Sequence, residues 1–83
     1  MTTRRHGGSA NYTITAEAKD NVGVAYVDFY VDLFFRTRVE VPVSGTSDYV
    51  TALKIQQAGL HVVEARAFDT SGNTSSATVT VKR

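Results

Sequence analysis

The sequence predicts an all-β fold, an antiparallel β-sandwich of six to seven strands. Segment after segment alternates apolar and polar residues with a period of two, which is typical of strands with one buried face. Residues that favour turns separate these segments at intervals of about ten residues. No segment has helical periodicity. Two antiparallel sheets packed face to face would bury the apolar side of every strand, so a sandwich fits the pattern.

The first ten residues differ in composition from the rest of the chain. They combine charge, paired glycines and small polar residues, and we expect residues 1–10 to form a flexible N-terminal arm. The sandwich domain is then predicted for residues 11–83. The abrupt start of the alternating pattern favours a module cut from a longer protein over a small protein with a loose arm.

The first two predicted strands each have one apolar side. In the first strand, which ends at the turn-forming residues 20–23, the inward residues are Tyr12, Ile14, Ala16 and Ala18. The second strand, residues 24–35, carries much of the aromatic mass and organises the fold. Its core side consists of Ala25, Val27, Phe29 and Val31. Its outer side is polar and aromatic and consists of Tyr26, Asp28, Tyr30 and Asp32.

The next segment alternates again, and the two segments are predicted to form a hairpin with Leu33 at its tip. This register places apolar residues opposite apolar ones on the inner face. On the outer face it places Asp28 opposite Arg38, and Tyr30 opposite Arg36. A slip by one residue would mix the two faces, so this register is favoured.

Three more strands are predicted after the hairpin, at residues 49–55, 60–68 and 75–82. Turn-forming segments separate them, at residues 44–48, 56–59 and 69–73. In the strand at residues 60–68 the inward positions include the small residues Ala65 and Ala67. This favours a central strand that the other sheet covers closely.

Composition excludes several classes of protein. The chain has 83 residues, enough for one small domain, and nine basic and eight acidic residues give a net charge of +1. So balanced a charge does not suit a nucleic-acid binder. Without cysteine there is no disulfide framework and no thiolate metal site. No apolar run is long enough to insert in a membrane. We also expect the chain to be a monomer.

Two stretches of the chain resemble a known family. They are DNVGVAYVDFYVD at residues 20–32 and GLHVVEARAFDTSGNTSSATVTV at residues 59–81. Together they resemble the bacterial immunoglobulin-like (Big-type) domains of secreted and cell-surface proteins. The resemblance implies an immunoglobulin-like sandwich in an extracellular or cell-surface protein. It also implies a non-catalytic accessory role, as a spacer, structural or adhesion unit beside the neighbouring domains of a parent protein.

The sequence departs from that family in two places. Members usually have Asp-Gly after the aromatic strand, whereas here Asp32 is followed by Leu33 and Phe34. We expect Leu33 and Phe34 to form an exposed apolar tip. An aspartate-rich, proline-containing stretch often precedes the first strand of the family, and residues 1–8 take its place here. The first edge strand is therefore predicted to be short or absent.

Calcium is the one cofactor for which the sequence offers a candidate site. Three turns are predicted to gather at one end of the sandwich, where they bring together Asp20, Asn21, Asp48, Asp69 and Asn73. Oxygen donors of this kind suit Ca²⁺, but the spacing of an EF-hand is absent. Turn chemistry alone also explains these residues. We therefore expect no cofactor and keep calcium as the less favoured alternative.

The outer sheet face is the better candidate for binding. Side chains that are common at protein interfaces could project from it: Tyr26, Tyr30, Arg36, Arg38, Arg66 and Phe68. Such a face could bind a carbohydrate, such as a polysaccharide, or a surface protein. Cross-strand aromatic and ionic pairs also stabilise exposed sheets without any ligand. Ligand binding is therefore the alternative function, after the accessory role.

Nothing in the sequence indicates an enzyme. His6 and His61 are too few and too far apart for a usual metal site, and we expect His61 to be partly buried and satisfied by the backbone. Nucleophilic catalysis needs a nucleophile, a base and an orienting group within reach of one another. The predicted strand faces bring no such set together. The chain is therefore predicted to be non-catalytic.

Overall fold

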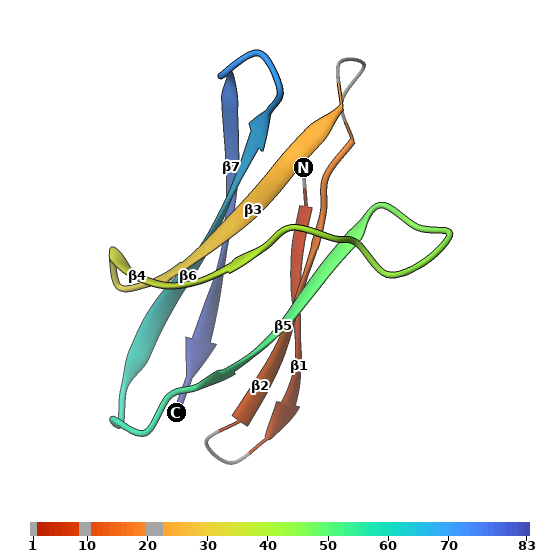
Figure 1. Cartoon of the computed structure of the whole chain (residues 1–83). Coiled ribbons are helices and arrows are strands. Elements are labelled where there is room, and N and C mark those ends of the chain that lie inside the picture. Colours follow the sequence, from red (N-terminus) through yellow and green to blue (C-terminus); the bar gives the residue numbers. More distant parts are fainter. Residues whose placement is uncertain (1, 9–10, 20–22) are drawn as a thin grey trace.

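The chain folds into two antiparallel sheets that pack face to face (Figure 1). The computed structural model describes residues 2–8, 11–19 and 23–83, and that part of the chain contains seven strands. They are β1 (Thr2–Gly8), β2 (Asn11–Glu17), β3 (Val24–Val31), β4 (Phe34–Val39), β5 (Asp48–Lys54), β6 (Leu60–Asp69) and β7 (Thr74–Lys82). The strand orders are β1-β2-β5 and β4-β3-β6-β7. The predicted immunoglobulin-like sandwich is confirmed. Within the described residues, no helix is long and apolar enough to span a membrane.

The core lies between the sheets. Seven of the eight side chains predicted to point inward from the first two strands belong to it, and Ala25, at a register irregularity between β3 and β6, does not. The three-stranded sheet and the segments that follow its strands contribute Tyr12, Ile14, Ala16, Ala18, Tyr49, Leu53 and Ile55. The four-stranded sheet contributes Val27, Phe29, Val31, Val63, Ala65, Ala67 and Val81. Full burial of a large apolar side chain contributes about 1.5–3 kcal/mol, so these sets fix which side of each strand faces inward. The strand with the small alanines, β6, lies between β3 and β7 as predicted.

Residues Thr2–Gly8 form β1, so the predicted flexible arm at residues 1–10 is wrong for this part of the chain. β1 pairs with β2 along its length and ends with Gly8 opposite Asn11. The Thr3 hydroxyl donates a hydrogen bond of 3.4 Å to the carbonyl oxygen of Ala77 in β7. An edge strand is held by backbone hydrogen bonds and needs no alternating apolar pattern, so composition did not indicate it. The prediction of a short or absent first edge strand fails for the same reason.

The β3–β4 hairpin keeps the predicted register only away from its tip. Asp28 lies opposite Arg38, and the neighbouring pairs also match the prediction. Beyond Phe29 the register shifts by one residue, so Tyr30 lies opposite Phe35 and not opposite Arg36. The predicted pairing of Tyr30 with Arg36 is therefore wrong.

The shift follows from the turn of the hairpin. Asp32 and Leu33 have φ angles of 49° and 73°, so both lie in the left-handed region, as in a type I′ turn of two residues. The two-residue turn pairs Val31 with Phe34. If this register continued along the hairpin without a bulge, Phe29 would lie opposite Arg36. A β-bulge takes up one residue of β4 and so restores apolar pairing on the inner face.

Candidate functional site

Five of the six residues predicted to form a binding face lie together on the outer side of the four-stranded sheet. They are Tyr26, Tyr30, Arg38, Arg66 and Phe68, on strands β3, β4 and β6. Phe35 of β4 joins them because it lies opposite Tyr30 and contacts its ring. We call these six residues the aromatic–arginine face.

The first half of this face is a stack built around a buried carboxylate. The centres of the Tyr26 and Phe68 rings lie 4.9 Å apart. The Arg38 guanidinium carbon lies 3.8 Å from the centre of the Tyr26 ring. Arg38 also donates hydrogen bonds of 2.8 and 3.1 Å to the two carboxylate oxygens of Asp28. Asp28 is only 3% exposed although it points outward. These bonds raise the pKa of Arg38 and hold its cation against the ring.

The second half of the face also has an arginine over a tyrosine ring, here Arg66 over Tyr30. The guanidinium carbon of Arg66 lies 4.2 Å from the centre of the Tyr30 ring. Its Nε lies 3.0 Å from Oε2 of Glu64, and its Nη2 lies 3.1 Å from Oε1 of the same carboxylate. The hydrogen bond to Glu64 is the main reason why the pKa of Arg66 is raised. The rings of Tyr30 and Phe35 contact each other edge to face, with their centres 5.8 Å apart. Both arginines and both tyrosines of the face are therefore engaged with neighbours on the same sheet.

Arg36, the sixth predicted residue, is absent from this face. The bulge turns it toward β5, where its Nη2 donates a hydrogen bond of 2.9 Å to the carbonyl oxygen of Lys54. Phe35 takes the place predicted for Arg36. A reading of Asp32 and Leu33 as a two-residue turn would have found this exchange, because it moves the pairing near the tip by one residue.

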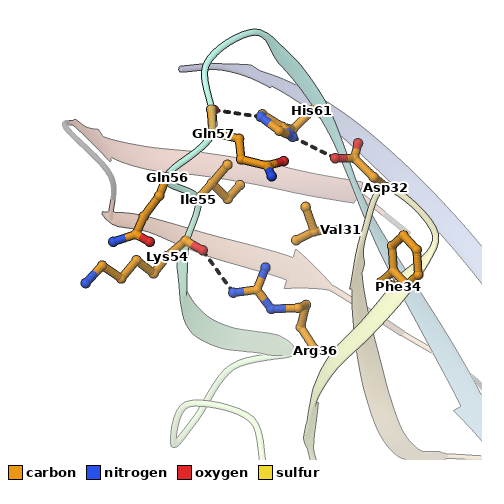
Figure 2. A pocket seen from close by; sticks show the side chains of 9 residues that line it. All are labelled: Val31, Asp32, Phe34, Arg36, Lys54, Ile55, Gln56, Gln57 and His61. Carbon is orange, nitrogen blue, oxygen red and sulfur yellow. Dashed lines mark hydrogen bonds and ion pairs between the residues drawn. The ribbon is translucent and has the colours of Figure 1, made fainter.

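A groove of about 440 Å³ lies where the β3–β4 turn meets the segment that joins β5 to β6 (Figure 2). Its lining residues are Val31, Asp32, Phe34, Arg36, Lys54, Ile55, Gln56, Gln57 and His61. We call it the tip groove. Figure 2 shows the Arg36 guanidinium and the Gln57 amide on opposite sides of Val31 and Ile55. The groove thus combines an apolar floor with polar walls.

His61 forms one wall of the tip groove and is 6% exposed, so it is more buried than predicted, and the backbone satisfies only one of its two ring nitrogens. Its Nδ1 lies 2.6 Å from Oδ2 of Asp32, and its Nε2 lies 2.8 Å from the carbonyl oxygen of Gln57. The hydrogen bond to Asp32, and then that to Gln57, raises the pKa of His61. The hydrogen bond from His61, together with that from the Val62 amide, lowers the pKa of Asp32. Both ring nitrogens are engaged, so neither can accept a proton from a substrate.

The structure describes three of the five residues predicted as calcium ligands: Asp48, Asp69 and Asn73. Asp69 caps its own turn: Oδ1 accepts bonds of 2.8 Å from the backbone amides of Ser71 and Asn73, and Oδ2 accepts one of 3.0 Å from the Asn73 side chain. Asp48 begins β5, and Asp20 and Asn21 lie outside the described residues. In the described part of the chain no three His, Cys, Asp or Glu side chains form a group that could hold a metal. Turn chemistry accounts for Asp69 and Asn73.

The predicted apolar tip is confirmed. Leu33 is 80% exposed and Phe34 is 75% exposed at the β3–β4 turn. Leu60 and Val62, at the start of β6, are also exposed. Apolar side chains therefore gather at the end of the sandwich that carries the tip groove.

Comparison with known proteins gives a likeness of structure but none of sequence. No family model and no curated protein matches the chain. The crystal structure of the spore cortex lytic enzyme SleM of Clostridium perfringens contains a region similar to 99% of this chain, with a TM-score of 0.72 and 9% identity. The chain spans 27% of the length of that enzyme. At so low an identity the likeness concerns the fold alone.

Proposed function

We propose that the chain is a non-catalytic accessory module of the bacterial immunoglobulin-like type, acting as a spacer or structural unit in a larger secreted or cell-surface protein. The observation that carries this proposal is the course of β1 and β7. Thr3, near the start of β1, contacts Ala77, while Tyr12, beside the end of β1, donates a hydrogen bond to the carbonyl oxygen of Lys82. The two strands therefore run side by side in the same direction (Figure 1).

This course suits a spacer. Segments joined to the start of β1 and to the end of β7 would leave from opposite ends of a sandwich that measures 39 × 25 × 17 Å. Domains attached there would be held apart along its length. The likeness to a region of SleM supports the proposal, because in that protein a fold of this kind makes up 27% of a longer chain. The locked ring of His61 supports a non-catalytic role.

A distance measurement tests the spacer role. The module is fused between a donor and an acceptor fluorescent domain, and the distribution of distances between them is measured by single-molecule energy transfer. A flexible Gly/Ser linker of the same length serves as the control. We expect one narrow distribution for the module and a broad one for the linker. A distribution as broad as that of the linker would contradict the proposal.

Binding of a carbohydrate or protein by the aromatic–arginine face is the alternative function. The contacts on this face favour a stabilising role, because Arg38 and Arg66 already cover Tyr26 and Tyr30. A panel of polysaccharides and surface proteins, tested with the native chain and with Tyr30→Ala, separates the two roles. Specific binding that Tyr30→Ala abolishes would support the alternative. A well-folded native chain that binds nothing on the panel would support the stabilising role.

A further inference from the structure

The tip groove carries positive charge that its own carboxylate does not balance. Asp32 is the one acidic residue among the nine that line the groove. Its Oδ2 contacts His61, and its Oδ1 accepts a hydrogen bond of 2.9 Å from the Val62 amide. Asp32 therefore balances His61, and the charges of Arg36 and Lys54 remain for a ligand.

Arg36 is held in a position to receive that ligand. Its Nη2 donates to the carbonyl oxygen of Lys54 at 2.9 Å, which ties the guanidinium to β5 across the groove. A guanidinium has five N–H donors in a planar fork, so this single bond leaves several donors for a second partner. A carboxylate accepts two parallel hydrogen bonds from such a fork. The charge and the geometry both suit an acidic ligand.

The rest of the groove suits a sugar ring. Val31 and Ile55 form the floor, with exposed fractions of 7% and 4%. The 75% exposed ring of Phe34 lies at one side, and the Gln57 amide lies across the floor from Arg36 (Figure 2). A pyranose has an apolar C–H face that can lie on an aromatic ring and hydroxyl groups that can bond to an amide. The volume of about 440 Å³ falls within the usual range of small-ligand sites.

We propose that the tip groove binds a carboxylate-bearing sugar, such as a hexuronate unit of an acidic polysaccharide. Arg36 holds the carboxylate, Lys54 adds charge, Phe34 carries the apolar face of the ring, and Gln57 bonds to a hydroxyl group. An acidic peptide side chain would engage Arg36 but would leave Phe34 and Gln57 without a role. This binding goes beyond the accessory role, which needs no ligand and stands whether or not the sugar binds.

Calorimetric titration of the 83-residue chain with a galacturonic acid oligosaccharide tests the proposal. The methyl-esterified form of the same oligosaccharide is the matched neutral ligand, and polyglutamate is the acidic peptide. Arg36→Gln removes the proposed carboxylate ligand. Lys19→Gln removes one charge from an exposed residue outside the groove and is the control variant. Phe34→Ala removes the proposed surface for the ring. Circular dichroism checks the fold of each variant.

We expect the acidic sugar to bind at least about tenfold more tightly than its ester. Arg36→Gln should lower its affinity by about tenfold, and Lys19→Gln should change it by less than about twofold. Phe34→Ala should weaken binding of the sugar. Four results would overturn the proposal: no binding at about 10 mM sugar, equal binding of the ester, equal losses in Arg36→Gln and Lys19→Gln, or tighter binding of polyglutamate.

Discussion

His61 and Asp32 join the start of β6 to the β3–β4 turn through a contact of 2.6 Å between Nδ1 and Oδ2. The other ring nitrogen faces the carbonyl oxygen of Gln57 at 2.8 Å. A neutral imidazole can donate from only one nitrogen, and here both nitrogens face acceptors. The contacts therefore favour the doubly protonated ring, and its charge is balanced by Asp32.

This arrangement predicts a pH dependence of stability. The pKa of His61 is raised above 6.5, so its contribution is complete below pH 6.5 and is lost as the pH rises through the raised pKa. The pKa of Asp32 is lowered below 3.8, so its contribution is present above pH 3.8 and is lost as the pH falls through the lowered pKa. The pair should therefore stabilise the fold most between pH 3.8 and 6.5.

Urea unfolding from about pH 4 to pH 9 measures this contribution. Asp32→Asn should lower the urea midpoint most at about pH 5 to 6, which lies between the reference pKa values of the two groups. The decrease of the midpoint that the native chain shows at higher pH should be largely absent in this variant. Glu40→Gln makes the same change of charge at an exposed site and should leave the profile nearly unchanged. Parallel profiles for the native chain and Asp32→Asn would show that the pair contributes nothing.

The backbone conformation of the β3–β4 turn predicts which of two substitutions at Leu33 gives the more stable protein. Leu33 has a φ of 73°, where a side chain with a Cβ is strained, while glycine is not. Leu33→Gly should raise the free energy of unfolding by about 0.5–1 kcal/mol relative to Leu33→Ala, which keeps the Cβ. Both variants remove the exposed apolar side chain, so their comparison isolates the backbone. Equal stabilities would mean that the turn is not strained at Leu33.

The buried carboxylate of the aromatic–arginine face gives a third prediction. Asp28 is 3% exposed and is paired with Arg38, so Arg38→Met should leave a buried charge without its partner. The urea midpoint should fall clearly further for Arg38→Met than for Arg36→Met, in which the lost side chain is exposed. Adding Asp28→Asn to Arg38→Met should recover part of the loss. If the two single variants unfold alike, the stack contributes little to stability.

The first strand gives a fourth prediction. β1 pairs with β2 and contacts β7, so removal of residues 1–8 should lower the thermal midpoint and expose the edge of β2. Hydrogen exchange should then become faster for the amides of β2 that face β1. A truncated chain as stable as the whole chain would restore the interpretation of residues 1–10 as a flexible arm.

The sequence predicts the core of this fold well because burial imposes a strict period on each strand. The alternation of Val27, Phe29 and Val31 could be satisfied in only one orientation, and the structure has that orientation. β1 could not be predicted in this way, because an edge strand depends on backbone pairing that leaves little trace in composition. The turn was misjudged because Leu33 occupies a conformation that usually belongs to glycine.

Of the two candidate sites, one follows from the periodic sequence pattern and the other does not. Cross-strand partners such as Asp28 and Arg38 follow directly from strand register, so the aromatic–arginine face could be outlined from the sequence. The tip groove could not, because it depends on the bulge that turns Arg36 toward Lys54. It also depends on the fold of the segment that brings Gln57 to His61. Neither feature has a periodic signal.

The size and location of the native polypeptide test whether the chain is an accessory module of a larger protein. An antibody raised against the module is used on immunoblots of cytosolic, cell-wall and secreted fractions of the source organism. An accessory module should be detected in a polypeptide clearly larger than 9.0 kDa, in the cell-wall or secreted fraction. A band at 9.0 kDa confined to the cytosolic fraction would contradict the proposed function.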